Sequence, residues 1–115
     1  MKLYRWSDVP LEQMNPAVGR QVIHAQRMTV ARVQLRKGGL VAPHRHESEQ
    51  ITLLAEGRLR FTVEGESVVL EPGEILHVPS GALHQVEALE DSIATDLFAP
   101  RREDWIRGDD SYLRG

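Results

Sequence analysis

Apolar and polar residues alternate over short stretches along most of the chain, and Gly or Pro separates one stretch from the next. The clearest example is RLRFTV at 58–63, where an apolar residue occupies every second position. This period of two is typical of a β-strand with one buried face and one solvated face. Few segments show the 3.6-residue period of an amphipathic helix. The pattern therefore predicts an all-β fold.

The predicted strands are short, and recognisable turns separate them. They cover 28–35, 50–55, 58–63, 68–70, 75–89 with a break at Pro-Ser-Gly, and 92–99. EGES at 64–67 predicts a hairpin turn, and in EPGE at 71–74 Pro72 presets the backbone while Gly73 takes a positive φ angle. Roughly six to eight such strands favour a double-sheet roll, which leaves few exposed sheet edges.

Only the C-terminal end changes character. Pro100 favours a helix start and Gly108 a helix end, which predicts a short helix at 101–107. The tail also carries Trp105, Tyr112 and Leu113, which we assign to packing.

Composition limits the class of function. The chain has 115 residues with 14 basic and 17 acidic side chains, a net charge of −3 and no cysteine. Its length predicts one domain over 1–115, and its scattered Lys and Arg residues argue against nucleic acid or an anionic membrane as partner. A small molecule is the expected partner. Because MKLYRWSDVP lacks the apolar core of a signal peptide, we expect a cytoplasmic protein.

Three histidines and one glutamine form the candidate metal site. In an extended PHRHESEQ segment, His44, His46 and Gln50 share one face, whereas Glu49 points to the other. The Pro-Ser-Gly turn then delivers a third imidazole, His84, from a separate strand. A lone His-x-His pair is more often a polar surface feature, but donors converging from different strands favour a metal. We therefore predict His44, His46, Gln50 and His84 as ligands.

The two histidine segments resemble the two motifs of the cupin family. The matching positions are Gly38, His44, His46, Gln50 and Gly57 in the first motif, and Gly73, Pro79, Gly81 and His84 in the second. The resemblance implies a double-stranded β-helix, or jelly-roll barrel, that binds one divalent metal ion. The chain departs from the family pattern at two positions, where Gln50 replaces a Glu and Ala88 replaces an Asn.

The predicted ligand set leaves the metal identity open. Three imidazoles and an amide oxygen suit Ni, Zn, Fe(II) or Mn, and as neutral ligands they leave the ion its full positive charge, which favours an anionic ligand such as a carboxylate. Because imidazole binds metal only when neutral, we expect affinity to fall below about pH 6.5. We assign His24 and His77 to packing or surface roles. We place Arg20, Arg27, Arg58 and Arg60 on solvated faces.

The C-terminal segment TDLFAPRREDW offers a second constellation. Read alone, it contains a surface carboxylate, a core aromatic ring and a helix-start arginine. It resembles, however, the small pectin-degradation cupins of the KdgF type, which linearise 4,5-unsaturated uronates and also carry Gln at the third ligand position. The resemblance implies that Asp96 is a general acid or base, Phe98 a cavity wall and Arg102 a clamp for the substrate carboxylate.

Three functions remain open from the sequence. The first is a metal-dependent enzyme that opens and ketonises an unsaturated uronate from pectin or alginate breakdown. The second is a cupin dioxygenase, and the third is a cupin that binds a metal or small molecule without turnover. We also expect a homodimer, in which Trp6, Val22, Ile23 and the tail form an apolar face.

Overall fold

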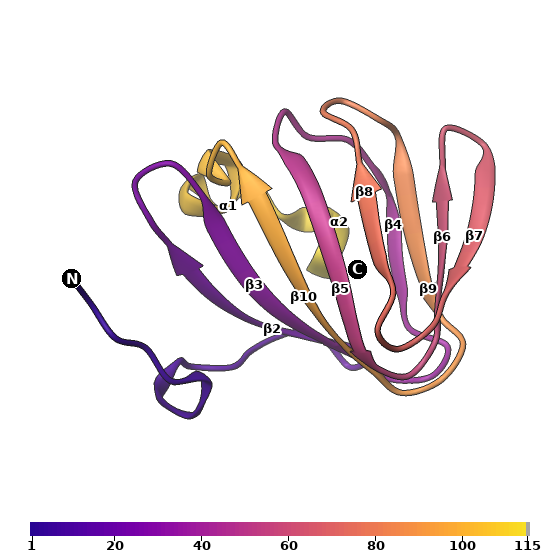
Figure 1. The fold of residues 1–115 in the computed structure, drawn as a ribbon, viewed down its shortest axis with the longest axis horizontal. Helices are drawn as coiled ribbons and strands as arrows, with labels where there is room; N and C mark the ends of the chain where they lie inside the picture. The colour runs from indigo at the N-terminus through magenta and orange to yellow at the C-terminus, as the bar shows by residue number, and fades with distance from the viewer. Residues whose placement is uncertain (115) are drawn as a thin grey trace.

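The computed structural model describes residues 1–114, and strands dominate them (Figure 1). The strands are β1 (Glu12–Asn15), β2 (Val18–His24), β3 (Thr29–Leu35), β4 (Leu40–His44), β5 (Glu49–Glu56), β6 (Leu59–Val63), β7 (Glu66–Leu70), β8 (Ile75–Val78), β9 (His84–Ala88) and β10 (Ser92–Ala99). The helices are a 3₁₀ turn η1 (Trp6–Asp8), α1 (Glu103–Arg107) and α2 (Ser111–Arg114). The all-β prediction is confirmed.

The strands form two antiparallel sheets that face each other. The larger sheet has the order β1-β2-β3-β10-β5-β8, and the smaller has the order β4-β9-β6-β7. Figure 1 shows the two sheets on opposite sides of the molecule with α2 between them, where it contacts β4 and β1. This arrangement is the double-sheet roll that the strand pattern predicts.

The core fills the space between the sheets. In β9 and β10 every second residue at the start of the strand is buried, so one face of each strand points inward. Leu59 and Phe61 on β6 are almost fully buried, with 1% and 2% of their surface exposed. Burial of such a side chain contributes about 1.5–3 kcal/mol. The alternation in the sequence therefore marks the core-facing residues.

The sequence pattern predicts one extended segment through His44, His46 and Gln50, but the structure divides it into two strands. Strand β4 ends at His44, a loop follows, and β5 begins at Glu49 in the other sheet. Pro43 is tolerated in β4 because β4 is an edge strand, where a missing N–H leaves no broken ladder. The segment therefore links the two sheets at one end of the roll.

Gly57 explains why the chain turns sharply after β5. Its φ angle is 94°, in the left-handed region. A Cβ atom at this position would overlap Asp91 and Ser92. Glycine is thus required both by the backbone conformation and by the close approach of the neighbouring segment.

The structure extends the prediction of a C-terminal helix and corrects the predicted exposure of Arg20. The helix before Gly108 forms, but a second short helix, α2, follows it. Arg20 does not lie on a solvated face, since only 4% of its surface is exposed. Its side chain is covered by the C-terminal segment, where it pairs with Asp110. Among residues 1–114, no helix is long and apolar enough to cross a membrane.

Candidate metal centre and active site

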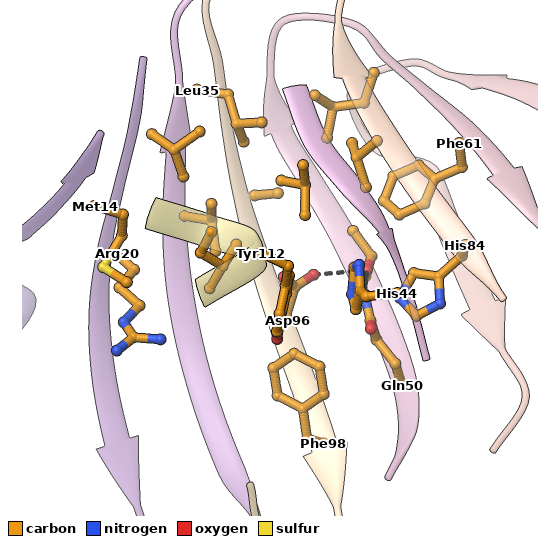
Figure 2. A pocket seen from close by; sticks show the side chains of 18 of the residues that line it. Met14, Arg20, Leu35, His44, Gln50, Phe61, His84, Asp96, Phe98 and Tyr112 are labelled. Atoms are coloured by element: carbon orange, nitrogen blue, oxygen red, sulfur yellow. Dashed lines mark hydrogen bonds between the residues drawn. The ribbon is translucent and has the colours of Figure 1, made fainter. Parts of the chain in front are cut away.

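Three histidines from different parts of the chain converge at one end of the roll. His44 ends β4 and is directly paired with His84, the first residue of β9, while His46 comes from the loop after β4. Their candidate ligand atoms all lie within 4.8 Å of one another. Figure 2 shows His44 and His84 on the same side of the cavity as Gln50. The three imidazoles therefore form a candidate metal site.

Backbone carbonyl groups set the orientation of all three imidazole rings. Each Nδ1 atom lies 2.8 Å from the carbonyl oxygen of a residue two positions away in the chain. The partners are Ala42 for His44, Ser48 for His46 and Ala82 for His84. A carbonyl oxygen only accepts, so Nδ1 carries the hydrogen and the Nε2 lone pair is left to bind a metal.

The Gln50 amide is held with its oxygen toward the histidines. Its Nε2 donates to Thr52 Oγ1 at 2.9 Å, and Oε1 lies 3.1 Å from His46 Nε2. With Nδ1 of His46 protonated, both atoms of that close pair are acceptors. A cation between them removes this mismatch, so the donor set fits a divalent metal ion.

Glu49 points away from the histidines, as strand alternation predicts. Its side chain is 61% exposed, and Oε2 lies 2.7 Å from His77 Nε2. His77 therefore has a surface role, as expected. His24 likewise has a local partner, with Nδ1 2.8 Å from Thr29 Oγ1.

Burial keeps the imidazoles of the cluster neutral. Loss of solvation lowers the pKa of His44 to about 3 and that of His46 to about 4. It also lowers the pKa of His84. Desolvation disfavours the charged imidazolium, and neutral imidazole is the form that binds metal. The cluster is thus ready to bind a cation at neutral pH.

These pKa shifts change the expected acid sensitivity of the site. Protons compete for Nε2 only near or below the lowered pKa values. The fall in metal affinity, which the sequence predicts to start at about pH 6.5, is therefore expected to start at a lower pH. We expect zinc-loaded protein to retain its metal during dialysis at about pH 5.5 against buffer without chelator, as measured by elemental analysis. Loss of half of the zinc near about pH 6.5 would contradict this expectation.

Asp96 lies beside the histidine cluster on β10. Thr52 Oγ1 donates to its Oδ1 at 2.6 Å, so one hydrogen-bond chain joins the Gln50 amide to this carboxyl group. Desolvation raises the pKa of Asp96 to about 6, while the hydrogen bond from Thr52 and the charge of Arg102 oppose the shift. A carboxyl group with a pKa near the working pH can both give and accept a proton.

Most hydrogen-bond donors of Arg102 are already used by neighbouring protein groups, so few remain to bind a substrate carboxylate. It is 1% exposed, and its Nε and Nη2 donate to Asp104 at 3.0 and 2.8 Å. Its Cζ atom lies 4.7 Å from the Phe98 ring centroid and 4.2 Å from that of Trp105. Among the described residues, Nη1 has no hydrogen-bond partner. Any direct contact with a ligand therefore depends on this nitrogen.

Tyr112, for which the sequence predicts only a packing role, belongs to the cavity wall. Its ring stacks on His44 with centroids 4.1 Å apart and an interplanar angle of 16°. Its hydroxyl oxygen accepts from Arg102 Nη2 at 2.5 Å and from Trp105 Nε1 at 2.7 Å. The sequence carried no signal for this position, because the tail reaches the site only when α2 packs between the sheets.

The cavity between the sheets brings these groups together (Figure 2). Its polar lining comprises Arg20, His44, Gln50, Thr52, His84, Asp96, Arg102 and Tyr112. Apolar residues of both sheets, among them Phe61 and Phe98, form the rest of the wall. The volume is about 50 Å³, room for a few water molecules. His44, Gln50, His84 and Asp96 thus face one common space, while His46 lines a separate pocket beside Ser48 and Pro100.

Comparison with known proteins identifies the fold family. The family described as the cupin domain matches residues 31–99, more than half of the chain. The chain belongs to the cupin family. The jelly-roll topology and the three-histidine site of this cupin agree with that assignment, and the resemblance of its two motifs is confirmed.

This cupin is most informatively compared with three proteins. It is 28% identical over 102 residues to the pectin degradation protein KdgF of Dickeya dadantii (strain 3937), covering 86% of this chain and 93% of that protein. It matches the structure of KdgF from Halomonas sp. with a TM-score of 0.85 and 30% identity, covering 91% and 98% of the two chains. An RmlC-like cupin from Shewanella frigidimarina NCIMB 400 has the same TM-score at 24% identity, covering 91% and 96%, and supports the fold alone.

Proposed function

We propose that this cupin is a metal-dependent enzyme that opens and ketonises 4,5-unsaturated uronates. The observation that carries the proposal is Asp96, a carboxyl group with a raised pKa that faces the same cavity as His44, His84 and Gln50. Similarity to KdgF proteins over most of the chain supports a role in pectin degradation.

We propose His44, His46, Gln50 and His84 as the ligands of one divalent ion. When bound, such an ion supplies a Lewis acid that can hold the carboxylate of the substrate. The backbone carbonyl groups and Thr52 keep the four side chains oriented toward one point. Ni, Zn, Fe and Mn all suit this donor set.

The proposed reaction is an isomerisation and needs no oxidant. The ring hemiacetal loses its O1 proton and O5 gains one as the C1–O5 bond breaks, which gives an aldehyde at C1 and an enol at C5. The enol oxygen then loses its proton while C4 gains one, which leaves a ketone at C5. Asp96 carries the proton to C4. Since Thr52 holds Oδ1, Asp96 Oδ2 is the oxygen that exchanges this proton.

The neighbouring side chains position the substrate. Phe98, 2% exposed, gives the cavity an apolar wall beside Asp96. Arg102 adds its positive charge and Nη1 as a contact for a substrate oxygen. A six-carbon acid is larger than the cavity volume of about 50 Å³, so binding requires the cavity to widen.

Loss of ultraviolet absorbance tests the proposal directly. The substrate double bond is conjugated with its carboxylate, so ring opening and ketonisation remove a chromophore. We expect metal-loaded protein to remove the absorbance of an unsaturated mono-uronate without consuming oxygen, and metal-stripped protein to leave it. Oxygen uptake would instead indicate a dioxygenase. Ligand-induced thermal stabilisation with persistent absorbance would indicate a binding protein.

A further inference from the structure

The guanidinium group of Arg20 is buried in the cavity wall, whereas the sequence predicts a solvated position. Arg20 lies on β2, and its side chain is 5% exposed. Figure 2 shows it on the opposite side of Asp96 and Phe98 from His84. The order β2-β3-β10-β5 places three strand spacings, about 14 Å, between its strand and that of Gln50. Arg20 therefore faces the cavity from the end remote from the histidines.

Only one of its three guanidinium nitrogens is satisfied. Nη2 donates to Asp110 Oδ2 at 2.6 Å and to Glu12 Oε2 at 3.3 Å. Nε and Nη1 are buried and have no hydrogen-bond partner within residues 1–114. A buried donor without an acceptor is unfavourable, most of all on a charged group. These two nitrogens thus have no acceptor in the protein, and a bound molecule can provide one.

The charge of Arg20 is also only partly neutralised. Asp110 accepts from Arg114 as well as from Arg20, so one carboxylate serves two guanidinium groups. Glu12 is a longer contact, and its side chain is 45% exposed. In addition, Arg20 Cζ lies 4.6 Å from the ring centroid of Trp105, which holds the guanidinium plane in place. A fixed, partly uncompensated cation at a cavity wall favours oxygen-rich ligands.

We infer that Arg20 is a substrate-binding residue that donates to the hydroxyl oxygens of a sugar acid, at the end remote from its carboxylate. The inference rests on the proposed function for the identity of that acid. In this arrangement the carboxylate lies toward the histidine cluster, the reacting carbons lie beside Asp96, and Arg20 holds the opposite end. Arg20 then selects hydroxylated ring acids over simple carboxylates of the same size.

Two unreactive acids test this selectivity without turnover. We compare a saturated hexuronate with tetrahydropyran-2-carboxylate, which keeps the oxygen-containing ring and the carboxylate but lacks the hydroxyl groups. Affinities for zinc-loaded protein are measured by calorimetric or NMR titration. We expect the wild-type protein to prefer the hexuronate by about tenfold, the scale of one good hydrogen bond to a charged donor.

The main variant is Arg20→Lys, which keeps the positive charge and a contact with Asp110 but removes the additional donors. We expect it to lose the preference for the hexuronate while zinc content and affinity for tetrahydropyran-2-carboxylate stay unchanged. The matched control is Arg60→Lys, at an exposed arginine that pairs with Glu87, which we expect to behave as wild type. Asp110→Asn removes the carboxylate partner and leaves the Arg20 donors in place.

Three outcomes would overturn the assignment of Arg20. They are a wild-type protein without preference between the two acids, an Arg20→Lys variant that keeps the preference, and an Asp110→Asn variant that loses it to the same extent. The last result would mean that Arg20 acts only by holding the C-terminal segment. Because neither acid reacts, a preference that depends on Arg20 can hold even if unsaturated uronates are not converted. The two proposals therefore fail separately.

Discussion

Replacing Asp96 with Asn is expected to lower turnover of an unsaturated mono-uronate by at least about 100-fold, the lower range for loss of a general acid or base. The amide cannot exchange a proton at the position of the carboxyl group, but it keeps an oxygen that accepts from Thr52. Initial rates of absorbance loss give the effect. Metal content, measured on the same samples, should stay at the wild-type level.

The matched control for this variant is Asp109→Asn. Asp109 pairs with Arg107 on the surface, and its side chain is 70% exposed. We expect full activity from this control, because the residue lies outside the cavity lining. Wild-type rates for Asp96→Asn would remove Asp96 from the mechanism and leave proton transfer to another group or to water. A loss of metal together with activity would show that Asp96 acts through the Gln50–Thr52 chain instead.

His46→Ala is expected to remove most of the bound metal, because it deletes one of three convergent imidazoles. Elemental analysis after dialysis measures the loss, and circular dichroism checks that the β-roll remains folded. Gln50→Ala should weaken metal binding by a smaller factor, since an amide oxygen is a weaker ligand than an imidazole. Both variants should lose activity in proportion to their metal content.

Glu49→Gln is the control that distinguishes the two neighbours on β5. Glu49 contacts His77 on the outer face, so its change should leave the metal bound. If Glu49→Gln empties the site and Gln50→Ala does not, the orientation of β5 at the site is wrong. Full retention of metal by His46→Ala would contradict the three-histidine site itself.

Local patterns in the sequence were sufficient to predict several of the strands around the candidate metal site. The alternation in RLRFTV and SIATDLFA predicts strands, and β6 and β10 form there. The Pro-Ser-Gly turn predicts that His84 begins a strand, and β9 begins at that residue. These predictions hold because alternation and turn chemistry depend on residues only a few positions apart.

The sequence predicted less well how the fold brings the first two histidines close to Gln50. Alternation along one extended segment places them on a common face, whereas the structure places His44 and Gln50 in different sheets with a loop between them. The candidate ligand atoms still converge, because the two sheets face each other across the cavity. The sequence pattern indicated residues that do converge, but through a geometry that the fold does not use.

What the sequence by itself determined is therefore the β-rich class, the turn positions and the identity of the converging donors, because each depends on short-range periodicity or on a motif. Only the tertiary structure decided the surroundings of the site. Arg20 is buried because it meets Asp110, 90 positions later in the chain, and Tyr112 reaches His44 because Asn15 and Leu113, 98 positions apart, fix α2 between the sheets. Contacts of such range leave no periodic trace, since each results from the packing of the two sheets and the tail together.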